Sequence, residues 1–530
     1  MKLVVYDTTL RDGAQGEGVQ FSVTDKLRIA KKLDQLGVHY IEGGWPGANP
    51  RDVEFFERAK ELRLTNARLT AFGSTCKPSN PADQDPILAQ LVAAGTPAVA
   101  IFGKTWPLHI TAVLQTTLAE NLRMIADSIR FLKTCNKEVI YDAEHFFDGF
   151  KSDQEYALST LQAAWEAGAD WIVLCDTNGG TLPHEITEIC AKVKQSIPVP
   201  LGIHAHNDAG LAVANSLLAV QQGVSQVQGT FNGYGERCGN ANLVSIIPSL
   251  QLKLDYPVFS KESLALLSST SRFISELANL TPDDKQPFVG KSAFAHKAGM
   301  HVDGVIKVSH SFEHINPESV GNNRRILVSD QAGRGNIINR VKRYSPNIEK
   351  NSPVITALLA KLKHLEFNGY QFEAAEGSLE LLIRQHLGGY TSHFELEDFR
   401  LLIARDSQEE MTSEAIVKIK VQDQLVHVVS NGLGPVNALD KALRKALEPF
   451  FPILKEMELA DYKVRVIDGT TGTGALVKVL IETRYHGDLW GTVGVSENIM
   501  EASMQALSES LEYGLMQYNT ADQFKAEQIV

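Results

Sequence analysis

Residues 139–177 read VIYDAEHFFDGFKSDQEYALSTLQAAWEAGADWIVLCDT, two short apolar runs with a helical pattern between them. The runs VIYDAE and WIVLCDT are almost continuously apolar, which is typical of parallel strands covered on both faces. Between them, residues 153–168 place Leu161 and Trp165 at helical spacing and end at Gly168. The segment therefore predicts a strand–helix–strand unit.

The same alternation extends over residues 1–265. Its strand-like runs are KLVVYDT, YIEGG, RLTAFG, AVAIFG, VIYDAE, WIVLCDT, LGIHAH and SQVQGT. Helical patterns lie between most of them, as at residues 24–37, where Thr24 is the expected N-cap and Gly37 the expected end. Eight such units in about 250 residues match a (β/α)8 TIM barrel in number and size. An open doubly wound sheet is the rival, although such sheets usually have fewer strands.

The pattern changes twice after the barrel. Residues 266–390 are mostly helical with two glycine-rich loops, HKAGMHVDG and VSDQAGRGNI. Residues 391–530 alternate apolar and polar side chains in IVKIKV, YKVRVID and VKVLIE, which indicates sheets with one face in water. Helices are expected near 435–447 and 498–516, giving two β-β-β-α units. We therefore predict an α/β chain: a barrel at 1–265, helical linker subdomains at 266–390 and an α+β C-terminal domain at 391–530.

Composition excludes several classes of protein. The chain has 530 residues, 44% hydrophobic and 22% charged, as in ordinary soluble globular proteins. A net charge of −12 argues against nucleic acid and anionic membranes as partners. The five cysteines include no CxxC pair, so we expect a cytoplasmic protein without a cysteine zinc site. No stretch resembles a signal peptide or is apolar enough to span a bilayer.

Polar side chains follow the ends of the predicted strands, the edge at which barrel enzymes carry their active sites. They include Arg11, Asp12, Glu42, Lys104, Glu144, Asp176, Thr177, His204, His206, Asn232, Glu236, Arg237 and Asn240. His204 and His206 are one residue apart, so both side chains point the same way along a strand and can bind one metal. Asp12 adds an anionic oxygen and Asn240 can add a neutral one. This ligand set suits Mn²⁺, Mg²⁺, Co²⁺ or Zn²⁺.

Each candidate also has a structural alternative. The two histidines can be hydrogen-bonded to backbone, and Arg11 beside Asp12 can be an ordinary ion pair of the barrel rim. As a functional group, Arg11 can hold the oxyanion that forms when a carbonyl is attacked. Glu144 becomes a candidate for proton transfer in a mouth that holds a metal. His301 lies outside the barrel in a glycine-flanked loop. It is a candidate catalytic residue only if that loop folds over a barrel mouth.

Three motifs carry a family resemblance. YDTTLRDGAQ at 6–15, HAHND at 204–208 and GYGERCGNANL at 233–243 together resemble the metal-dependent acyl-CoA condensing enzymes built on a TIM barrel. That family includes isopropylmalate, homocitrate and citramalate synthases. AFAHKAGMHVDG and VSDQAGRGNI also match, and NGLGPVNALDKAL resembles the feedback-inhibition domain of the isopropylmalate and citramalate enzymes. The resemblance covers essentially the whole chain, and IEGGWPGANPRD from Ile41 is most similar to the citramalate synthase branch.

The resemblance implies an acyltransferase that converts the acyl group into an alkyl group by joining acetyl-CoA to pyruvate. Such a reaction begins a threonine-independent route to isoleucine. It implies that Asp12, His204 and His206 bind the metal, with Asn240 as a fourth or near ligand and Mn²⁺ or Mg²⁺ as the expected ion. An isopropylmalate synthase is the alternative within the same reaction class.

The resemblance also assigns roles around the metal. Arg11 would stabilise the developing alkoxide, Glu144 would act in proton transfer or acetyl-CoA positioning, and Thr177 would contact the keto-acid carboxylate. His301 would be a catalytic histidine that reaches the partner barrel of a homodimer. Phe312 departs from the family, whose members carry an active-site tyrosine near this position. The base that deprotonates acetyl-CoA, His301 or Glu144, therefore stays open.

The C-terminal domain is implied to be regulatory, with isoleucine as the expected effector and leucine as the alternative. Backbone groups at its glycine-rich turns are expected to hold an amino acid; these glycines are Gly432, Gly434, Gly472 and Gly474. Dimerisation without effector binding is the other interpretation of this domain.

Two tryptophans follow predicted strands, Trp45 and Trp106. We expect at least one of them to narrow the pocket to pyruvate, because a binding site discriminates substrates by volume. Packing beneath loops is the alternative.

Three other functions compete with the synthase prediction. A TIM-barrel hydrolase also uses an H-x-H pair, but typically on its first strand, whereas here the pair lies on the seventh. A lyase of the hydroxymethylglutaryl-CoA type shares the barrel and the metal but lacks the C-terminal double module. A non-catalytic amino-acid sensor would not need the polar groups of the barrel mouth.

Overall fold

The computed structural model describes the following residues: 3–297, 299–326, 334–349, 352–388, 390–405, 411–467, 474–486 and 488–527. The chain forms two compact units. The first comprises Met1–Ala295 and Glu313–Arg325, and the second comprises His296–Phe312 and Ile326–Val530. Each unit is described separately below.

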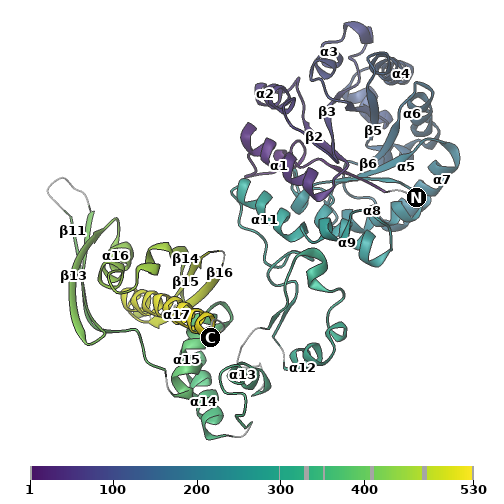
Figure 1. Cartoon of the computed structure of the whole chain (residues 1–530). Helices are drawn as coiled ribbons and strands as arrows, with labels where there is room; N and C mark the ends of the chain where they lie inside the picture. The colour runs from purple at the N-terminus through teal and green to yellow at the C-terminus, as the bar shows by residue number, and fades with distance from the viewer. Residues whose placement is uncertain are drawn as a thin grey trace. The chain divides into compact units, whose positions relative to one another are not determined.

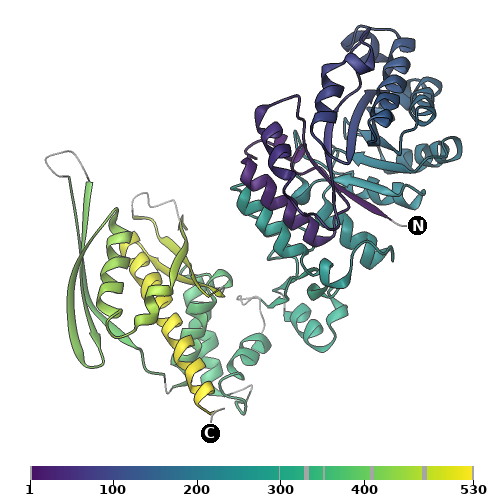
Figure 2. The same ribbon diagram turned by 45° about the horizontal axis from the view of Figure 1, so that its top comes forward.

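The first unit is built on a closed barrel of parallel strands (Figures 1 and 2). The strands are β1 (Val4–Asp7), β2 (Tyr40–Gly44), β3 (Arg68–Ser74), β4 (Ala98–Lys104), β5 (Glu138–Glu144), β6 (Trp171–Asp176), β7 (Leu201–Ala205) and β8 (Gln226–Gly229). Each strand pairs with the next along the chain, and β1 also pairs with β8, which closes the ring. The predicted TIM barrel is thus confirmed, and the open-sheet alternative is wrong.

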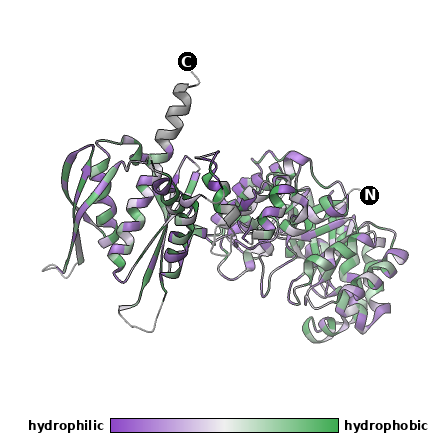
Figure 3. Ribbon diagram, turned by 90° about the horizontal axis from the view of Figure 1, so that it is seen from below, coloured by the Kyte–Doolittle hydropathy of each residue, from purple (hydrophilic) through white to green (hydrophobic). Residues whose placement is uncertain are grey.

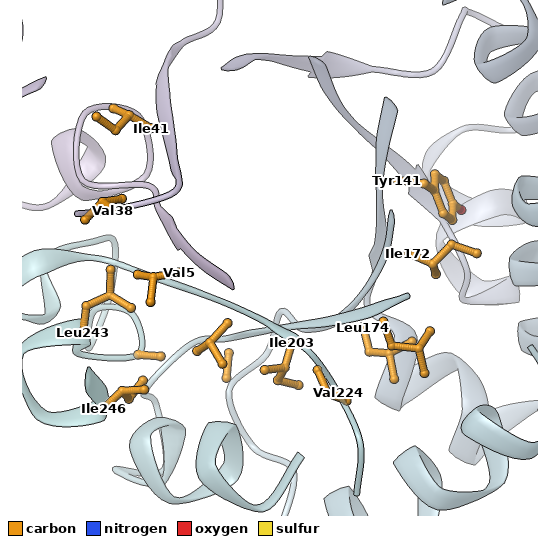
Figure 4. Close-up of a cluster of buried hydrophobic side chains, with 14 of the residues drawn as sticks. Val5, Val38, Ile41, Tyr141, Ile172, Leu174, Ile203, Val224, Leu243 and Ile246 are labelled. Carbon is orange, nitrogen blue, oxygen red and sulfur yellow. The ribbon is translucent and has the colours of Figure 1, made fainter. Parts of the chain in front are cut away.

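Helices surround this barrel. They are α1 (Val23–Leu36), α2 (Pro50–Ala59), α3 (Pro86–Ala93), α4 (Leu118–Thr134), α5 (Phe146–Ser152), α6 (Gln154–Glu166), α7 (Pro183–Ser196), α8 (Ala212–Gln221), α9 (Leu243–Lys253), α10 (Lys261–Leu264) and α11 (Leu267–Leu277). Side chains that alternate along each strand enter two separate cores. Val5 and Ile203 belong to the layer between strands and helices, with Leu243 of α9 (Figure 4), whereas Tyr6 belongs to the core inside the barrel.

Two local expectations about the barrel helices are wrong. The N-cap of α1 is Ser22 rather than Thr24, because Ser22 and Asp25 form a reciprocal capping box. On α6, Trp165 is 37% exposed, because the helix turns Leu161 and its neighbours toward the core instead. The N-cap of α6 is Asp153, whose carboxylate accepts a hydrogen bond from the backbone N–H of Tyr156 at 3.0 Å.

The middle of the chain contains four helices among the described residues: α12 (Gly299–Lys307), α13 (Arg334–Val341), α14 (Pro353–Phe367) and α15 (Glu376–Leu387). A short ladder joins β9 (Ala295–His296) to β10 (Arg325–Ile326). The expected loop around His301 is wrong, because these residues form α12. Of the second expected loop, residues 328–333 lie outside the described residues, and α13 begins at Arg334.

The C-terminal part contains the two predicted β-β-β-α units. The first has β11 (Phe394–Arg405), β12 (Met411–Val421), β13 (Gln424–Gly432) and α16 (Pro435–Leu447). The second has β14 (Glu458–Val466), β15 (Val477–Tyr485), β16 (Asp488–Ser496) and α17 (Ile499–Glu527), a longer helix than expected. Both sheets are antiparallel.

Hydropathy alternates along the strands of these sheets (Figure 3). On β12, Ala415, Val417 and Ile419 are fully buried, whereas the residues between them are only partly buried. One face of the first sheet therefore packs on α16, as the sequence pattern predicts. No helix among the described residues has the length and apolar character needed to cross a membrane.

Candidate active site

Three potential metal ligands meet at the mouth of the barrel. Asp12 follows β1, His204 lies on β7, and His206 comes directly after it. The Nε2 atom of His204 lies 3.3 Å from Asp12 Oδ2 and 3.3 Å from His206 Nε2. His206 Nε2 lies 4.0 Å from the same aspartate oxygen. Two nitrogens and one carboxylate oxygen thus converge on a single point, which is the arrangement that a divalent metal requires.

Asn240 lies next to this group. The chain at 239–241 runs antiparallel to β7 and its continuation, with Ala241 N donating to Ala205 O at 2.8 Å and Asn207 N donating to Gly239 O at 2.9 Å. The side-chain amide of Asn240 donates to Tyr234 O at 3.1 Å, and its buried Oδ1 has no hydrogen-bond partner among the described residues. Burying an unsatisfied carbonyl oxygen is costly, so this atom is suited to accept a bond from a metal or from metal-bound water.

A second layer of groups orients His204. Its Nδ1 atom lies 2.9 Å from Oε1 of Gln228 on β8, so the ring presents Nε2 to Asp12 and His206. The amide of Gln228 in turn contacts Gln226 Oε1 at 3.2 Å and Asp142 Oδ1 at 3.4 Å. Metal-bound histidines usually have such a partner on their other nitrogen.

The electrostatics of Asp12 and His206 favour metal binding. Burial opposes ionisation of Asp12, but the charges of Arg11 and His204 hold its pKa well below the ordinary value. Burial, followed by the charge of His204, lowers the pKa of His206 to about 4. An ionised carboxylate and a neutral imidazole are the forms that bind metals. Burial opposes protonation of His204, but its hydrogen bond to Asp12 and the charge of Asp12 raise its pKa, so a metal at this ring would displace a proton.

Arg11 is held from three sides. Its Nε donates to Glu42 Oε1 at 2.6 Å, its Nη1 lies 3.4 Å from Asp12 Oδ2, and its guanidinium stacks 3.7 Å from the ring centroid of Phe72. The buried Glu42 also accepts a hydrogen bond from Tyr6 at 2.5 Å. These contacts fix a cation beside the metal ligands.

Glu144 and Thr177 lie at the ends of β5 and β6. The Glu144 carboxylate forms an ion pair with Lys104 at the end of β4. Thr177 Oγ1 accepts a hydrogen bond from the backbone N–H of His145 at 2.9 Å, which leaves the hydroxyl proton free to be donated. Arg237 donates to the Thr177 carbonyl at 2.7 Å and ties the loops after β6 and β8 together.

One cavity of about 220 Å³ joins these groups. Its lining includes eight of the thirteen strand-end residues named from the sequence: Arg11, Asp12, Glu144, Thr177, His204, His206, Glu236 and Arg237. The other five do not line it: Glu42, Lys104, Asp176, Asn232 and Asn240. Sequence reasoning missed Phe72, Phe102 and Asp142, which also line it. Burial, followed by the charge of Glu42, raises the pKa of Asp142 to about 7.

The two tryptophans do not line this cavity. Trp45 packs behind its wall, with its ring centroid 5.8 Å from those of both Phe72 and Phe102. Trp106 stacks on His109, with ring centroids 5.3 Å apart. Phenylalanines occupy the inward positions on β3 and β4, so Trp45 can affect the width of the cavity only through the rings of Phe72 and Phe102. The expectation that a tryptophan narrows the pocket to pyruvate stays a prediction.

His301 is not part of the barrel unit. It lies on α12 of the second unit, where its ring stacks on Phe312 with centroids 4.2 Å apart. Gly304 permits this contact, since a Cβ at that position would lie 2.5 Å from the Phe312 ring.

Among the expected regulatory glycines, Gly472 lies outside the described residues. Gly432 has a packing role, because a Cβ there would lie 2.3 Å from Ala438 N.

Family models match consecutive parts of the chain. The HMGL-like model matches residues 2–274, the homocitrate synthase post-HMGL domain-like model matches 288–369, and the LeuA allosteric (dimerisation) domain matches 373–515. The chain is 55% identical to the (R)-citramalate synthase of Aquifex aeolicus over 97% of this chain and 98% of the relative. The chain belongs to the (R)-citramalate synthase family. Another relative of that name, from Synechocystis sp., is 53% identical over 97% of this chain and 96% of its own length.

The chain is less similar to 2-isopropylmalate synthases than to these two citramalate synthases. The 2-isopropylmalate synthase of Halalkalibacterium halodurans is 32% identical over 95% of each chain. The resemblance predicted from the sequence motifs is thus confirmed, including the branch indicated by the segment that begins at Ile41.

Proposed function

We propose that this protein condenses acetyl-CoA with pyruvate to give (R)-citramalate and CoA, as an acyltransferase that converts the acyl group into an alkyl group. The observation that carries the proposal is the convergence of Asp12, His204 and His206 on one cavity with Arg11, in a chain 55% identical to a named (R)-citramalate synthase. Citramalate formation would place the protein in isoleucine biosynthesis.

The donor set fits a divalent metal. Asp12, His204 and His206 would hold it, and the unsatisfied Oδ1 of Asn240 would face it or a water on it. The mixture of one carboxylate, two imidazoles and a neutral oxygen suits Mn²⁺ or Mg²⁺, with Zn²⁺ and Co²⁺ as alternatives. When bound, the metal supplies Lewis acidity to the keto oxygen of the substrate.

The remaining groups act directly on the substrates. Arg11, fixed by Glu42 and Phe72, points its charge at the site where an alkoxide develops. The Thr177 hydroxyl can donate to the keto-acid carboxylate. Glu144, paired with Lys104, is the barrel's candidate for proton transfer or for positioning acetyl-CoA. The base that takes the methyl proton is Glu144 or His301.

Acetyl-CoA needs more room than the metal cavity offers. A neighbouring cavity of about 440 Å³ is also lined by Arg11 and Gln15. Because both residues line both cavities, a long substrate can lie in the second cavity with its acetyl end in the first.

We also propose the three-domain division at 1–265, 266–390 and 391–530, with the last domain regulatory, and a cytoplasmic location. The match to a LeuA allosteric (dimerisation) domain supports a homodimer and an amino-acid effector, isoleucine before leucine. Gly434 and Gly474 stay candidates for effector contacts, since space around each is open. In the dimer, His301 would act on the partner barrel.

The deciding experiment measures release of the CoA thiol from acetyl-CoA in the presence of Mn²⁺. Pyruvate, 2-oxobutyrate and 2-ketoisovalerate are compared at equal concentrations, with the Asp12→Asn variant as the inactive control. A clear preference for pyruvate supports the proposal. Preference for 2-ketoisovalerate would make the protein an isopropylmalate synthase, and no release with any of them would point to lyase chemistry.

A further inference from the structure

A positively charged cavity lies in the second compact unit. It has a volume of about 460 Å³ and lies between β13, α16 and the short helix η8 (Pro452–Glu456). Its lining includes Ser430, Lys441, Arg444, Lys445, Glu448 and Lys455. Four cations thus surround one carboxylate, although the chain as a whole carries a net charge of −12.

Arg444 is rigidly placed in this cavity. Its Nε donates to both carboxylate oxygens of Asp440, at 2.9 and 3.1 Å. Its Nη1 donates to the backbone carbonyls of Leu454 at 2.7 Å and Met457 at 2.8 Å. The structure records no partner for Nη2 among the residues it describes, so this donor is available to a ligand. A guanidinium fixed in this way loses little entropy when it binds an anion.

The lysines around the cavity are in positions where their charges repel one another or have no acidic partner. Lys441 lies three and four residues before Arg444 and Lys445 on α16, and like charges at this spacing destabilise a helix. Lys445 has a structural role, because its Nζ donates to Val429 O on the edge strand β13 at 2.9 Å. Lys441 and Lys455 are exposed and form no ion pair within the described part of the chain. An anion bound beside Lys441 would offset its repulsion with Arg444 and Lys445.

We propose that this cavity binds a small molecule through a multiply charged phosphate group. Nη2 of Arg444, the donor left over by the contacts to Asp440, Leu454 and Met457, can donate to phosphate oxygens, and the lysines add point charges around it. A free amino acid carries as many positive as negative charges on its backbone groups, so it would gain little from four cations. The site is therefore distinct from the amino-acid site proposed for the glycine-rich turns, and it does not depend on the proposed catalysis.

The test uses inorganic pyrophosphate as the probe and calorimetric titration of the full-length chain. The buffer contains a chelator, because pyrophosphate would otherwise bind free divalent metal. The double variant K441Q/K455Q removes two charges from the cavity. The matched control K361Q/K363Q removes two exposed lysines from α14 of the same unit.

We expect saturable binding by the unmodified chain, at least tenfold weaker binding by K441Q/K455Q, and a change of less than twofold in the control. The charge-conserving variant K441R/K455R should retain binding. Pyrophosphate should also raise the unfolding temperature of the unmodified chain and leave that of K441Q/K455Q unchanged.

Three results would overturn the proposal. The first is absence of saturable binding by the unmodified chain. The second is equal weakening in K441Q/K455Q and K361Q/K363Q, which would show a general effect of net charge. The third is displacement of pyrophosphate by isoleucine, which would make the cavity the amino-acid site.

Discussion

At the scale of single residues, the candidate metal site depends on a side chain outside the proposed ligand set. Gln228 is buried inside the barrel and contacts His204 Nδ1 at 2.9 Å. A histidine ring that can rotate loses the geometry needed to share a metal with Asp12 and His206. Gln228 is therefore a positioning residue whose effect should be visible in metal affinity.

Replacing Gln228 by Leu should weaken metal binding about 10- to 100-fold, the usual effect of removing the partner of a ligating histidine. Calorimetric titration with Mn²⁺ measures the change. Gln221→Leu, at the end of α8, is the control and should bind Mn²⁺ as the unmodified chain does. Unchanged affinity in Gln228→Leu would show that another group orients His204.

Trp45 offers a second prediction at this scale, because it supports both phenylalanines of the cavity wall. Trp45→Ala should let Phe72 and Phe102 move outward, so the ratio of kcat/KM for pyruvate over 2-oxobutyrate should fall about tenfold. Trp106→Ala removes an indole that does not line the cavity and should leave the ratio unchanged. The opposite pattern would assign the selectivity to Trp106.

At the scale of elements, α15, α17 and β16 meet around a partly buried carboxylic acid, Glu509. Glu509 on α17 accepts a hydrogen bond from Ser378 on α15, and Ser378 accepts one from the backbone N–H of Val493 at 2.9 Å. Burial raises the pKa of Glu509 from 4.5 to about 7. The neutral acid is thus the form that the folded packing favours.

This packing predicts how stability depends on pH. Because the folded-state pKa is the higher one, the contribution of Glu509 is fully present below about pH 4.5 and is lost as pH rises to about 7. The loss is at most about 3.5 kcal/mol, since one pKa unit corresponds to about 1.4 kcal/mol.

Glu509→Gln should therefore unfold at a higher temperature than the unmodified chain at pH 8 and at nearly the same temperature at pH 4.5. Thermal unfolding followed by circular dichroism at both pH values measures the difference. Glu497→Gln, which changes an exposed carboxylate in the same unit, is measured in parallel as the control. A gain in Glu509→Gln of the same size at both pH values would rule out titration as the cause.

The strands of the barrel also explain which residues of the candidate site could be predicted from the sequence and which could not. The candidate ligands Asp12, His204 and His206 could be predicted because they lie at strand ends, where the fold itself brings them together. Phe72 and Phe102 were not, because each lies within an apolar strand and the sequence alone does not say which face points inward. A usable signal existed for Gln228: with Gln226, it gives two amides on one face of a short strand.

Local signals failed where two patterns compete. Glycines flank His301 and predict a loop, but Val302 and Val305 are buried and supply the apolar side of a helix. Thr24 and Ser22 are both good N-caps, and the choice of Ser22 depends on Asp25, which completes the capping box. In both cases tertiary packing or a single partner decided between locally acceptable structures.

At the scale of the whole molecule, each compact unit has hydrophobic cores of its own. In the second unit, Leu379 and Ile383 of α15 share a core with Val493 and Val495 of β16. A chain cut near residue 390 would therefore keep α15 but lose part of the surface on which it packs. A chain that ends at Arg325 follows the boundary of the first unit more closely.

The fragment 1–325 should fold, release some CoA thiol in the presence of Mn²⁺ and pyruvate, and no longer respond to isoleucine. Circular dichroism checks folding, and the thiol assay with and without isoleucine checks the rest. The intact chain, assayed in parallel, should be inhibited. Inhibition that survives in the fragment would place the effector site in the barrel unit.

Closure of the barrel has a consequence for how the protein is made. Strand β1 pairs with β8, so a ribosome must release the chain past residue 229 before the first strand finds its second neighbour. Asp12 comes early in synthesis, and His204 and Asn240 come late. The nascent N-terminal half therefore lacks two of the three candidate metal ligands, and the candidate site is complete only once the residues after β7 have been made.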